Sequence, residues 1–329
     1  MQDITTEIKR DLLKKMLSIR IFEERIVAVY PKQEMKTPVH LCIGQEACAA
    51  GVCAHLNKED LIFSTHRNHG HYIAKGADLR AITAELYGRT DGCTKGKGGS
   101  MHFVDVEAGC MGTTAIVGGS IPLGAGGALA LKMRGVNAIS AAFFGDGAAD
   151  EGVLQETLNF AALKKLPVLF ACENNFYATN SNVRARHAGP SIAARAAAFG
   201  IPNATVDGND AEIVWRAAGD AIAHIRSGKG PYFLEMTTYR WKGHVGPECD
   251  YEKGCRPKAE LDEWLNRCPI KLYTEKLLAE GAISQAEIDA IKAELTSRVD
   301  AAWEFALASP APKEKDLMTD VYRANREAA

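Results

Sequence analysis

Short hydrophobic runs alternate with helical patterns along most of the chain. Three runs of strand length occupy residues 138–144, 167–172 and 232–237, and polar residues follow each of them. A fourth run, at residues 61–65, stops at the polar and cationic stretch 66–71. Strands that alternate with helices are typical of a parallel sheet covered by helices on both faces. The pattern therefore predicts an α/β fold.

Helical patterns also open and close the chain. Residues 1–25 carry charges throughout, so we predict a structural helix there and no signal peptide. From residue 258 onward the pattern is helical, with helices expected at 270–279 and 284–307. We predict one domain at residues 1–257 and a helical extension at 258–329 that packs on it. The apolar face of the first helix comprises Ile8, Leu12, Ile19, Phe22 and Ile26.

Composition and charge exclude several classes of protein. The 329 residues hold 39 basic and 41 acidic side chains, and this balance gives no electrostatic reason to expect nucleic acid or a membrane as partner. Residues 108–131 are uncharged, but their seven glycines favour a loop followed by a buried helix over a membrane span. The nine cysteines form no C-x-x-C pair, so we expect reduced thiols and a cytoplasmic protein.

Two polar motifs follow strands that we expect to be neighbours. Gly145-Asp146-Gly147 follows the run at 138–144, and Asn174-Asn175 follows the run at 167–172, with a helical pattern between them. A right-handed crossover makes the two strands parallel, so Asp146 and Asn175 should meet at one edge of the sheet. Carboxylate and amide oxygens suit Mg²⁺ or Ca²⁺, and a helix that opens near Ala148 would direct N–H groups at the same place. The motifs therefore predict a metal-bridged diphosphate site.

Other glycine-rich phosphate motifs do not fit. A P-loop would need glycine at Asp91, and serine or threonine at Gly98 after Lys97. A dinucleotide fingerprint that starts at Gly124 would need glycine or alanine at Leu129.

The paired motifs resemble the signature of thiamine-diphosphate enzymes, in which Gly-Asp-Gly and Asn-Asn stand at a similar interval. Further blocks resemble the alpha subunit of the decarboxylating component of 2-oxo acid dehydrogenases, in that family's order and over nearly the whole chain. These blocks are residues 40–47, 66–70, 95–102, 116–118 with 122–126, 239–244 and 316–322.

The resemblance implies a role for each matching residue at the cofactor's diphosphate. Asp146 and Asn175 would be side-chain ligands of Mg²⁺, and the carbonyl of Tyr177 would complete the protein ligands. Gly147 and Ala148 would present their backbone to the diphosphate.

The resemblance also assigns the remaining contacts. Arg67 would hold a phosphate, with His66 beside it. Ala115 and Val117 match positions whose backbone groups meet the aminopyrimidine ring. The histidines that would surround the reacting carbon, and would bind substrate or handle protons, are His40, His69 and His244.

The implied activity is decarboxylation of a 2-oxo acid such as pyruvate, with transfer of the acyl group to a lipoyl group on a separate acyltransferase. The glutamate that helps to activate the cofactor has no match here, and in the family it belongs to a beta subunit. We therefore predict an α2β2 assembly and no activity of this chain alone.

The chain departs from the family's pattern at two places. His66 stands where the family usually has tyrosine, although imidazole can also donate a hydrogen bond. Residues 245–250 replace a serine-rich loop of many pyruvate-specific members, which removes a regulatory phosphorylation site and leaves the substrate open. We expect the glycine-containing loop 243–256 to be mobile and to order when cofactor binds.

Several alternatives stay open. Acetoin cleavage would use the same cofactor chemistry, and half of a split transketolase would share the two motifs, although the blocks at 40–47, 95–102 and the tail favour the dehydrogenase. A noncatalytic assembly subunit would not need a complete metal and phosphate set. We interpret His55, His187 and His224 as structural. A transition-metal site at His66, His69 and His71 is opposed by Arg67.

Overall fold

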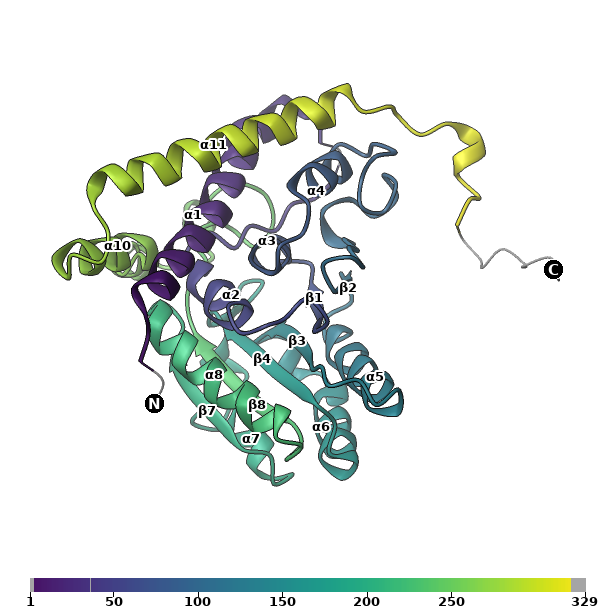
Figure 1. Cartoon of the computed structure of the whole chain (residues 1–329), viewed down its shortest axis with the longest axis vertical. Coiled ribbons are helices and arrows are strands. Elements are labelled where there is room, and N and C mark those ends of the chain that lie inside the picture. Colours follow the sequence, from purple (N-terminus) through teal and green to yellow (C-terminus); the bar gives the residue numbers. More distant parts are fainter. Residues whose placement is uncertain (1–2, 36, 321–329) are drawn as a thin grey trace.

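The computed structural model describes residues 3–35 and 37–320, and within them a six-stranded parallel sheet forms the centre of the molecule (Figure 1). The strand order is β2-β1-β3-β4-β8-β7. A short antiparallel hairpin, β5-β6, lies outside this sheet. The strands are β1 Leu61–Thr65, β2 Cys110–Thr114, β3 Ser140–Gly145, β4 Val168–Asn174, β5 Tyr177–Ala178, β6 Ser181–Asn182, β7 Asn203–Asp207 and β8 Tyr232–Thr237.

Helices cover both faces of the sheet. Side chains alternate along each strand, so successive residues pack against the helices on opposite faces. In β3, Ala141 and Phe143 pack with α1, α2, α3, α4, α8 and α11, whereas Ala142 and Phe144 pack with α5, α6 and α7. The helices are α1 Thr6–Val29, α2 Glu46–Cys53, α3 His69–Lys75, α4 Leu79–Leu86, α5 Ser120–Met133, α6 Gly152–Lys164, α7 Ala194–Ala197, α8 Ala211–Arg226, α9 Lys258–Asn266, α10 Pro269–Ala279 and α11 Gln285–Ala308. Short 3-10 helices are η1 Tyr30–Lys32, η2 Gly99–Met101, η3 Ala148–Asp150, η4 Val183–Ala185, η5 Asp250–Lys253 and η6 Glu314–Asp316.

The C-terminal helices pack against the first helix. Leu12 and Met16 of α1 share a hydrophobic cluster with Leu277 of α10 and Ile288 of α11, and α11 crosses α1 at the top of Figure 1. A capping box starts α11, because the Ser284 side chain accepts from the N–H of Glu287 while the Glu287 carboxylate accepts from the N–H of Ser284. The helices expected at 270–279 and 284–307 are thus present within one residue, while the division at residue 258 stays a prediction.

The central strands lie where the hydrophobic runs predicted them, but two edge strands were not expected. Within the part of the chain that the structure describes, β2 and β7 lie at the edges of the sheet and each pairs with one neighbour, and most of their residues are only partly buried. An edge strand needs no continuous apolar run, so these two gave no clear signal. Residues 108–131 therefore contain β2 as well as the expected helix, α5, which is buried on one side only.

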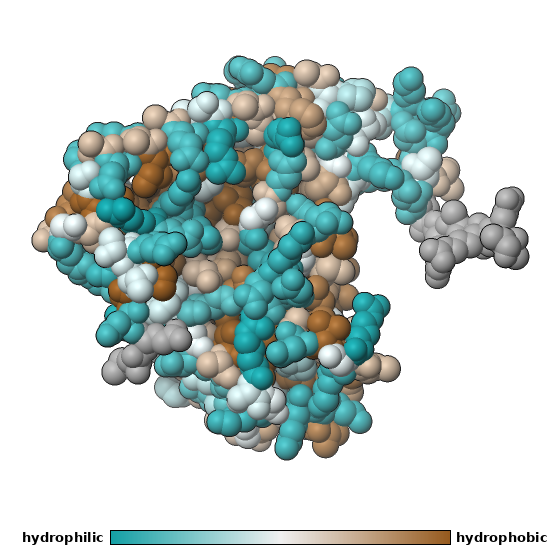
Figure 2. Space-filling model, viewed as in Figure 1, coloured by the Kyte–Doolittle hydropathy of each residue, from teal (hydrophilic) through white to brown (hydrophobic). Residues whose placement is uncertain are grey.

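The surface agrees with the balanced composition. Figure 2 shows hydrophilic residues over most of the viewed face, with separate hydrophobic patches between them. Among the described residues, no helix is both long enough and apolar enough to cross a membrane. Of the block at 316–322, Val321 and Tyr322 lie outside the described residues.

Candidate functional site

A cavity of about 360 Å³ opens at the carboxyl ends of β1, β3 and β4. Thr65, Gly145 and Glu173, at or near the ends of these strands, contribute to its wall. Ligand sites of parallel α/β sheets lie at this edge, outside the carboxyl ends of the strands. The sequence-predicted residues that line the cavity are His66, Arg67, Val117, Asp146, Gly147, Ala148, Asn175, Tyr177 and His244.

Asp146 and Asn175 reach the cavity together because of the strand register. β3 pairs with β4 in parallel and Gly145 stands opposite Glu173, so the residues that follow leave the sheet side by side. Both side chains are buried. The predicted neighbourhood of the two motifs is therefore confirmed.

The helix start was predicted too early. Ala148–Asp150 form the 3-10 turn η3, and α6 begins only at Gly152, because Glu151 has an extended backbone. Gly147 nonetheless requires glycine, since a Cβ there would lie 2.8 Å from the Cβ of Ala178. The backbone of Gly147 therefore packs closely against the β5-β6 hairpin, next to Asp146.

Arg186 is a cationic partner of Asp146 that the sequence did not reveal. Its guanidinium forms ion pairs with both Asp146 and Asp150. Burial raises the pKa of Asp146, and the nearby Arg186 opposes this rise. A buried carboxylate needs such a counter-charge. Arg186 follows the hairpin and η4, and no strand-end pattern marks it.

A buried chain of hydrogen bonds orients Asn175. Its side-chain amide donates to Gln45 Oε1 at 3.1 Å, and its Oδ1 accepts from the N–H of Tyr177 at 3.3 Å. Gln45 in turn donates to Glu173 Oε2 at 3.4 Å, and Glu173 Oε1 lies 3.0 Å from His71 Nε2. Gln45 and Glu173 are functional candidates that motif reasoning missed, although Gln45 lies within the block 40–47 and Glu173 directly precedes Asn174.

Tyr177 can offer only its backbone to a metal. Its hydroxyl is used, because it donates to Glu260 Oε2 at 2.6 Å. A carboxylate at Asp146, an amide oxygen at Asn175 and a backbone carbonyl at Tyr177 are all hard oxygen donors, which are the ligands that Mg²⁺ prefers. The donor set at the cavity therefore fits a magnesium ion.

Arg67 places a buried positive charge in the same cavity. Its guanidinium donates to the carbonyls of Leu41, at 2.6 Å, and His244, at 3.2 Å. Burial and the nearby Arg240 lower the pKa of Arg67 to about 10, so it stays charged at neutral pH. The arrangement suits an anion such as a phosphate or a carboxylate.

Three histidine rings meet beside Arg67. The ring centroids of His40 and His66 are 4.6 Å apart, and that of His244 lies 5.2 Å from His40 and 5.3 Å from His66. Burial, followed by the charge of Arg67, lowers the pKa of His40 to about 2, of His66 to about 3 and of His244 to about 4. His40 is not part of the cavity lining but contacts both histidines that are.

The structure does not bring every predicted residue to the cavity. His69 is fully buried in α3, where Nδ1 lies 3.0 Å from Glu23 Oε1 and Nε2 lies 2.9 Å from Ser100 Oγ. Ala115 is also outside the lining, although Thr114 and Ile116 on either side belong to it. The roles assigned to His69 and Ala115 therefore stay predictions without support from their position.

The loop expected to be mobile has a buried anchor. Asp250 accepts from Arg240 at 3.0 Å and from Arg256 at 2.7 Å, and all three side chains are buried. The N–H of Gly246 also donates to the carbonyl of Val39 at 2.8 Å. Whether the loop orders only with cofactor stays a prediction.

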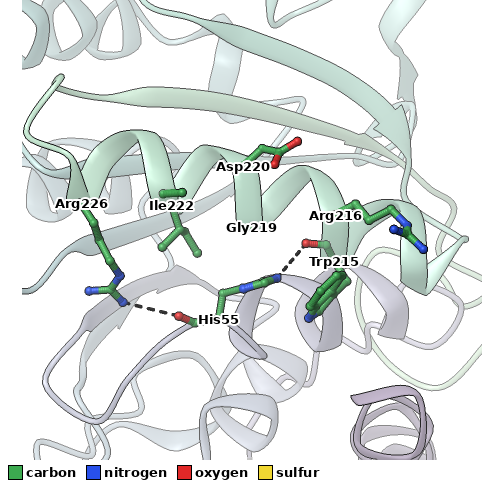
Figure 3. Close-up of a pocket in the computed structure, with 8 residues that line it drawn as sticks. His55, Trp215, Arg216, Gly219, Asp220, Ile222 and Arg226 are labelled. Atoms are coloured by element: carbon green, nitrogen blue, oxygen red, sulfur yellow. Dashed lines mark hydrogen bonds between the residues drawn. The ribbon is translucent and has the colours of Figure 1, made fainter. Parts of the chain in front are cut away.

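A second cavity, of about 420 Å³, lies between the end of α2 and α8 (Figure 3). Two of its polar groups have partners within the protein: His55 Nε2 lies 2.8 Å from the carbonyl of Trp215, and Arg226 pairs with Asp60. It shares no lining residue with the cavity at the strand ends. We therefore place the candidate site at the strand ends despite the larger volume of this second cavity.

Comparison with known proteins gives one consistent family. Residues 14–315 match the family model described as dehydrogenase E1 component. The alpha subunits of acetoin:2,6-dichlorophenolindophenol oxidoreductase from Cupriavidus necator and Bacillus subtilis are 42% and 41% identical to this chain; the matches cover 94% and 97% of it and 92% and 95% of those proteins. The pyruvate dehydrogenase E1 component subunit alpha of Rhizobium meliloti is 40% identical to this chain, and the match covers 95% of this chain and 90% of that protein.

Proposed function

This chain belongs to the dehydrogenase E1 component family, and we propose that it is the alpha subunit of a thiamine-diphosphate-dependent dehydrogenase that decarboxylates a 2-oxo acid and passes the acyl group to a lipoyl carrier. The observation that carries the proposal is the convergence of Asp146, Asn175 and Arg67 on one cavity at the strand ends. These residues supply the metal ligands and the cation that a bound diphosphate needs.

The chain's own residues would hold the cofactor's diphosphate. Asp146, Asn175 and the carbonyl of Tyr177 would bind Mg²⁺, and Gly147 and Ala148 would lie against the diphosphate. Arg186 would give up its contact with Asp146 when the metal binds, because one carboxylate cannot serve both cations in the same position. When bound, thiamine diphosphate supplies the nucleophilic carbon that attacks the substrate carbonyl.

The histidine rings would act as neutral groups. The pKa values of His40 and His244 lie far below 7, so each ring is uncharged before substrate arrives. A neutral ring donates a hydrogen bond from one nitrogen and accepts a hydrogen bond at the other, so it can bind a polar substrate group.

A beta subunit would cover the open side of the cavity. Ile116 and Val117 are 76% and 50% exposed although they line the cavity, and Leu123 nearby in sequence is 50% exposed. Hydrophobic side chains around the mouth of a site favour a protein partner there. We propose that this partner is the beta subunit, which would supply the glutamate that has no match in this chain.

Acetoin is the second candidate substrate. The acetoin-named relatives share 42% and 41% identity with this chain, against 40% and 39% for two bacterial pyruvate dehydrogenase alpha subunits. These differences are too small to select a substrate. The absence of serine from residues 245–250 is compatible with either.

The test is dye reduction by this chain, co-purified with its beta subunit and supplied with Mg²⁺ and thiamine diphosphate. The substrates are pyruvate, 2-oxobutyrate, branched-chain 2-oxo acids, 2-oxoglutarate and acetoin. We expect turnover of one compound, its loss in Asp146→Asn, and its retention in Asp220→Asn, which changes an exposed carboxylate in the same way. Cofactor binding without turnover of any compound would refute the substrate classes, and absence of cofactor binding would refute the function.

A further inference from the structure

Three separate segments bring imidazole nitrogens together beside the cavity. His40 precedes α2, His66 follows β1, and His244 follows β8. One ring nitrogen from each lies within 4.8 Å of the corresponding nitrogen of the other two. This group differs from the stretch 66–71 considered in the sequence, because His69 and His71 point to other partners.

Contacts between the backbones hold these segments in place. Arg67 binds the carbonyls of Leu41 and His244, and so links the segments that carry all three histidines. The N–H of Gly246 donates to the carbonyl of Val39 at 2.8 Å. These contacts bring the three segments together, which lowers the cost of ordering the rings around a metal ion.

We propose that His40, His66 and His244 form a binding site for a borderline transition-metal ion such as Zn²⁺, separate from the oxygen ligands at Asp146. Three imidazoles with one open position form a known type of zinc coordination. With Zn–N bonds of about 2.0–2.1 Å, three tetrahedrally arranged rings have their centroids about 5.2 Å apart. The centroids here are 4.6, 5.2 and 5.3 Å apart. The ring nitrogens lie within 4.8 Å of one another, compared with about 3.3 Å around one zinc ion, so the rings must turn to bring these nitrogens together.

One ring nitrogen of this cluster lacks a partner within the described part of the protein. Nδ1 of His40 is buried and has no hydrogen-bond partner among the described residues. A buried ring nitrogen without a partner gains from coordination.

The surrounding charges determine the fourth ligand. Arg67 and Arg240 disfavour positive charge at His244, and the carboxylate of Asp250 opposes them. Zinc at this site should therefore carry an anion, such as hydroxide, chloride or a carboxylate, in its open position. Mg²⁺ should not compete, because it prefers oxygen ligands.

Zinc bound at this site should also inhibit the enzyme, and this expectation rests on the proposed function. The metal would take up the ring nitrogens of His40 and His244 that we propose for binding substrate. We therefore expect Zn²⁺ to inhibit dye reduction in competition with the substrate. Binding itself needs neither cofactor nor substrate, so it can be measured independently.

The experiment titrates the full chain with ZnCl₂ by calorimetry, in excess Mg²⁺ and without thiamine diphosphate. Co²⁺ in place of Zn²⁺ gives an optical spectrum that reports tetrahedral coordination. We expect one tight site, and His66→Tyr should weaken it about 100-fold or more, since even an outer contact to a metal ligand is worth about 10- to 100-fold. Tyrosine is the residue that the family usually has at this position.

Two controls separate this site from others. His224→Gln changes a histidine outside the cluster and should leave the Zn²⁺ affinity unchanged. Asp146→Asn removes an oxygen ligand of the proposed Mg²⁺ site and should also leave the Zn²⁺ affinity unchanged. His40→Asn serves as a second ligand variant if His66→Tyr does not fold. The proposal is overturned if the ligand variants bind Zn²⁺ as tightly as the original chain, or if Co²⁺ gives only an octahedral spectrum.

Discussion

The glycine-rich loop at residues 88–101 depends on one buried carboxylate, and this dependence can be measured. Glu85 of α4 is fully buried. Its Oε2 accepts from the N–H groups of Thr94 and Gly96, both at 2.9 Å, and its Oε1 accepts from Gly98 at 2.8 Å and Gly99 at 3.0 Å. Of these donors, the N–H of Gly98 has a second acceptor in Thr94 Oγ1, at 3.2 Å.

Glu85→Gln keeps one oxygen and replaces the other with an NH₂ group. The new group would face two N–H donors, so two charge-assisted hydrogen bonds are lost. At about 1.5–3 kcal/mol for each bond, the free energy of unfolding should fall by about 3–6 kcal/mol. The loop should also loosen around Ser100, which lies 2.9 Å from His69 Nε2.

Urea unfolding followed by circular dichroism measures this loss, and hydrogen exchange of residues 88–101 locates it. Asp91→Asn is the matched control, because it makes the same chemical change at an exposed position of the same loop and should alter stability by less than about 0.5 kcal/mol. A loss below about 1 kcal/mol in Glu85→Gln, with unchanged exchange in the loop, would show that the carboxylate does not organise it.

Four further outcomes are expected. Asp146→Asn should weaken the Mg²⁺-dependent binding of thiamine diphosphate at least tenfold in calorimetry, and equal affinity would contradict its role as ligand. Gly147→Ala should impair cofactor binding because its Cβ would lie 2.8 Å from that of Ala178, whereas Gly152→Ala, with no atom within 4 Å, should not. Burial lowers the folded-state pKa of His55 below 6.5, so the unfolded chain binds a proton at this ring more readily than the folded chain does. The free energy of unfolding should therefore fall as the pH drops below 6.5. Between pH 6.5 and 5, the urea midpoint of His55→Gln should decline less steeply than that of the original chain. Without its beta subunit the chain should not reduce dye, and full activity alone would refute the proposed assembly.

The part of the site that could be predicted lies where strands end. Asp146 and Asn175 follow buried runs, and the handedness of the crossover then places them together without further information. The early prediction of a helix at Ala148 was wrong because the extended backbone of Glu151 separates η3 from α6. The edge strands β2 and β7 escaped prediction because partly exposed strands carry no continuous hydrophobic run.

The sequence by itself determined the fold class, the family and the edge of the sheet that carries the polar motifs. Periodic burial specifies the strands and helices locally, because each must hide its own apolar face, whereas the family follows from the motif blocks. Only the tertiary structure placed Arg186 beside Asp146, turned His69 away from the cavity and brought His66 against His40 and His244. These contacts join loops far apart in the chain, and the path of a loop follows from packing and hydrogen bonding that no periodic pattern records.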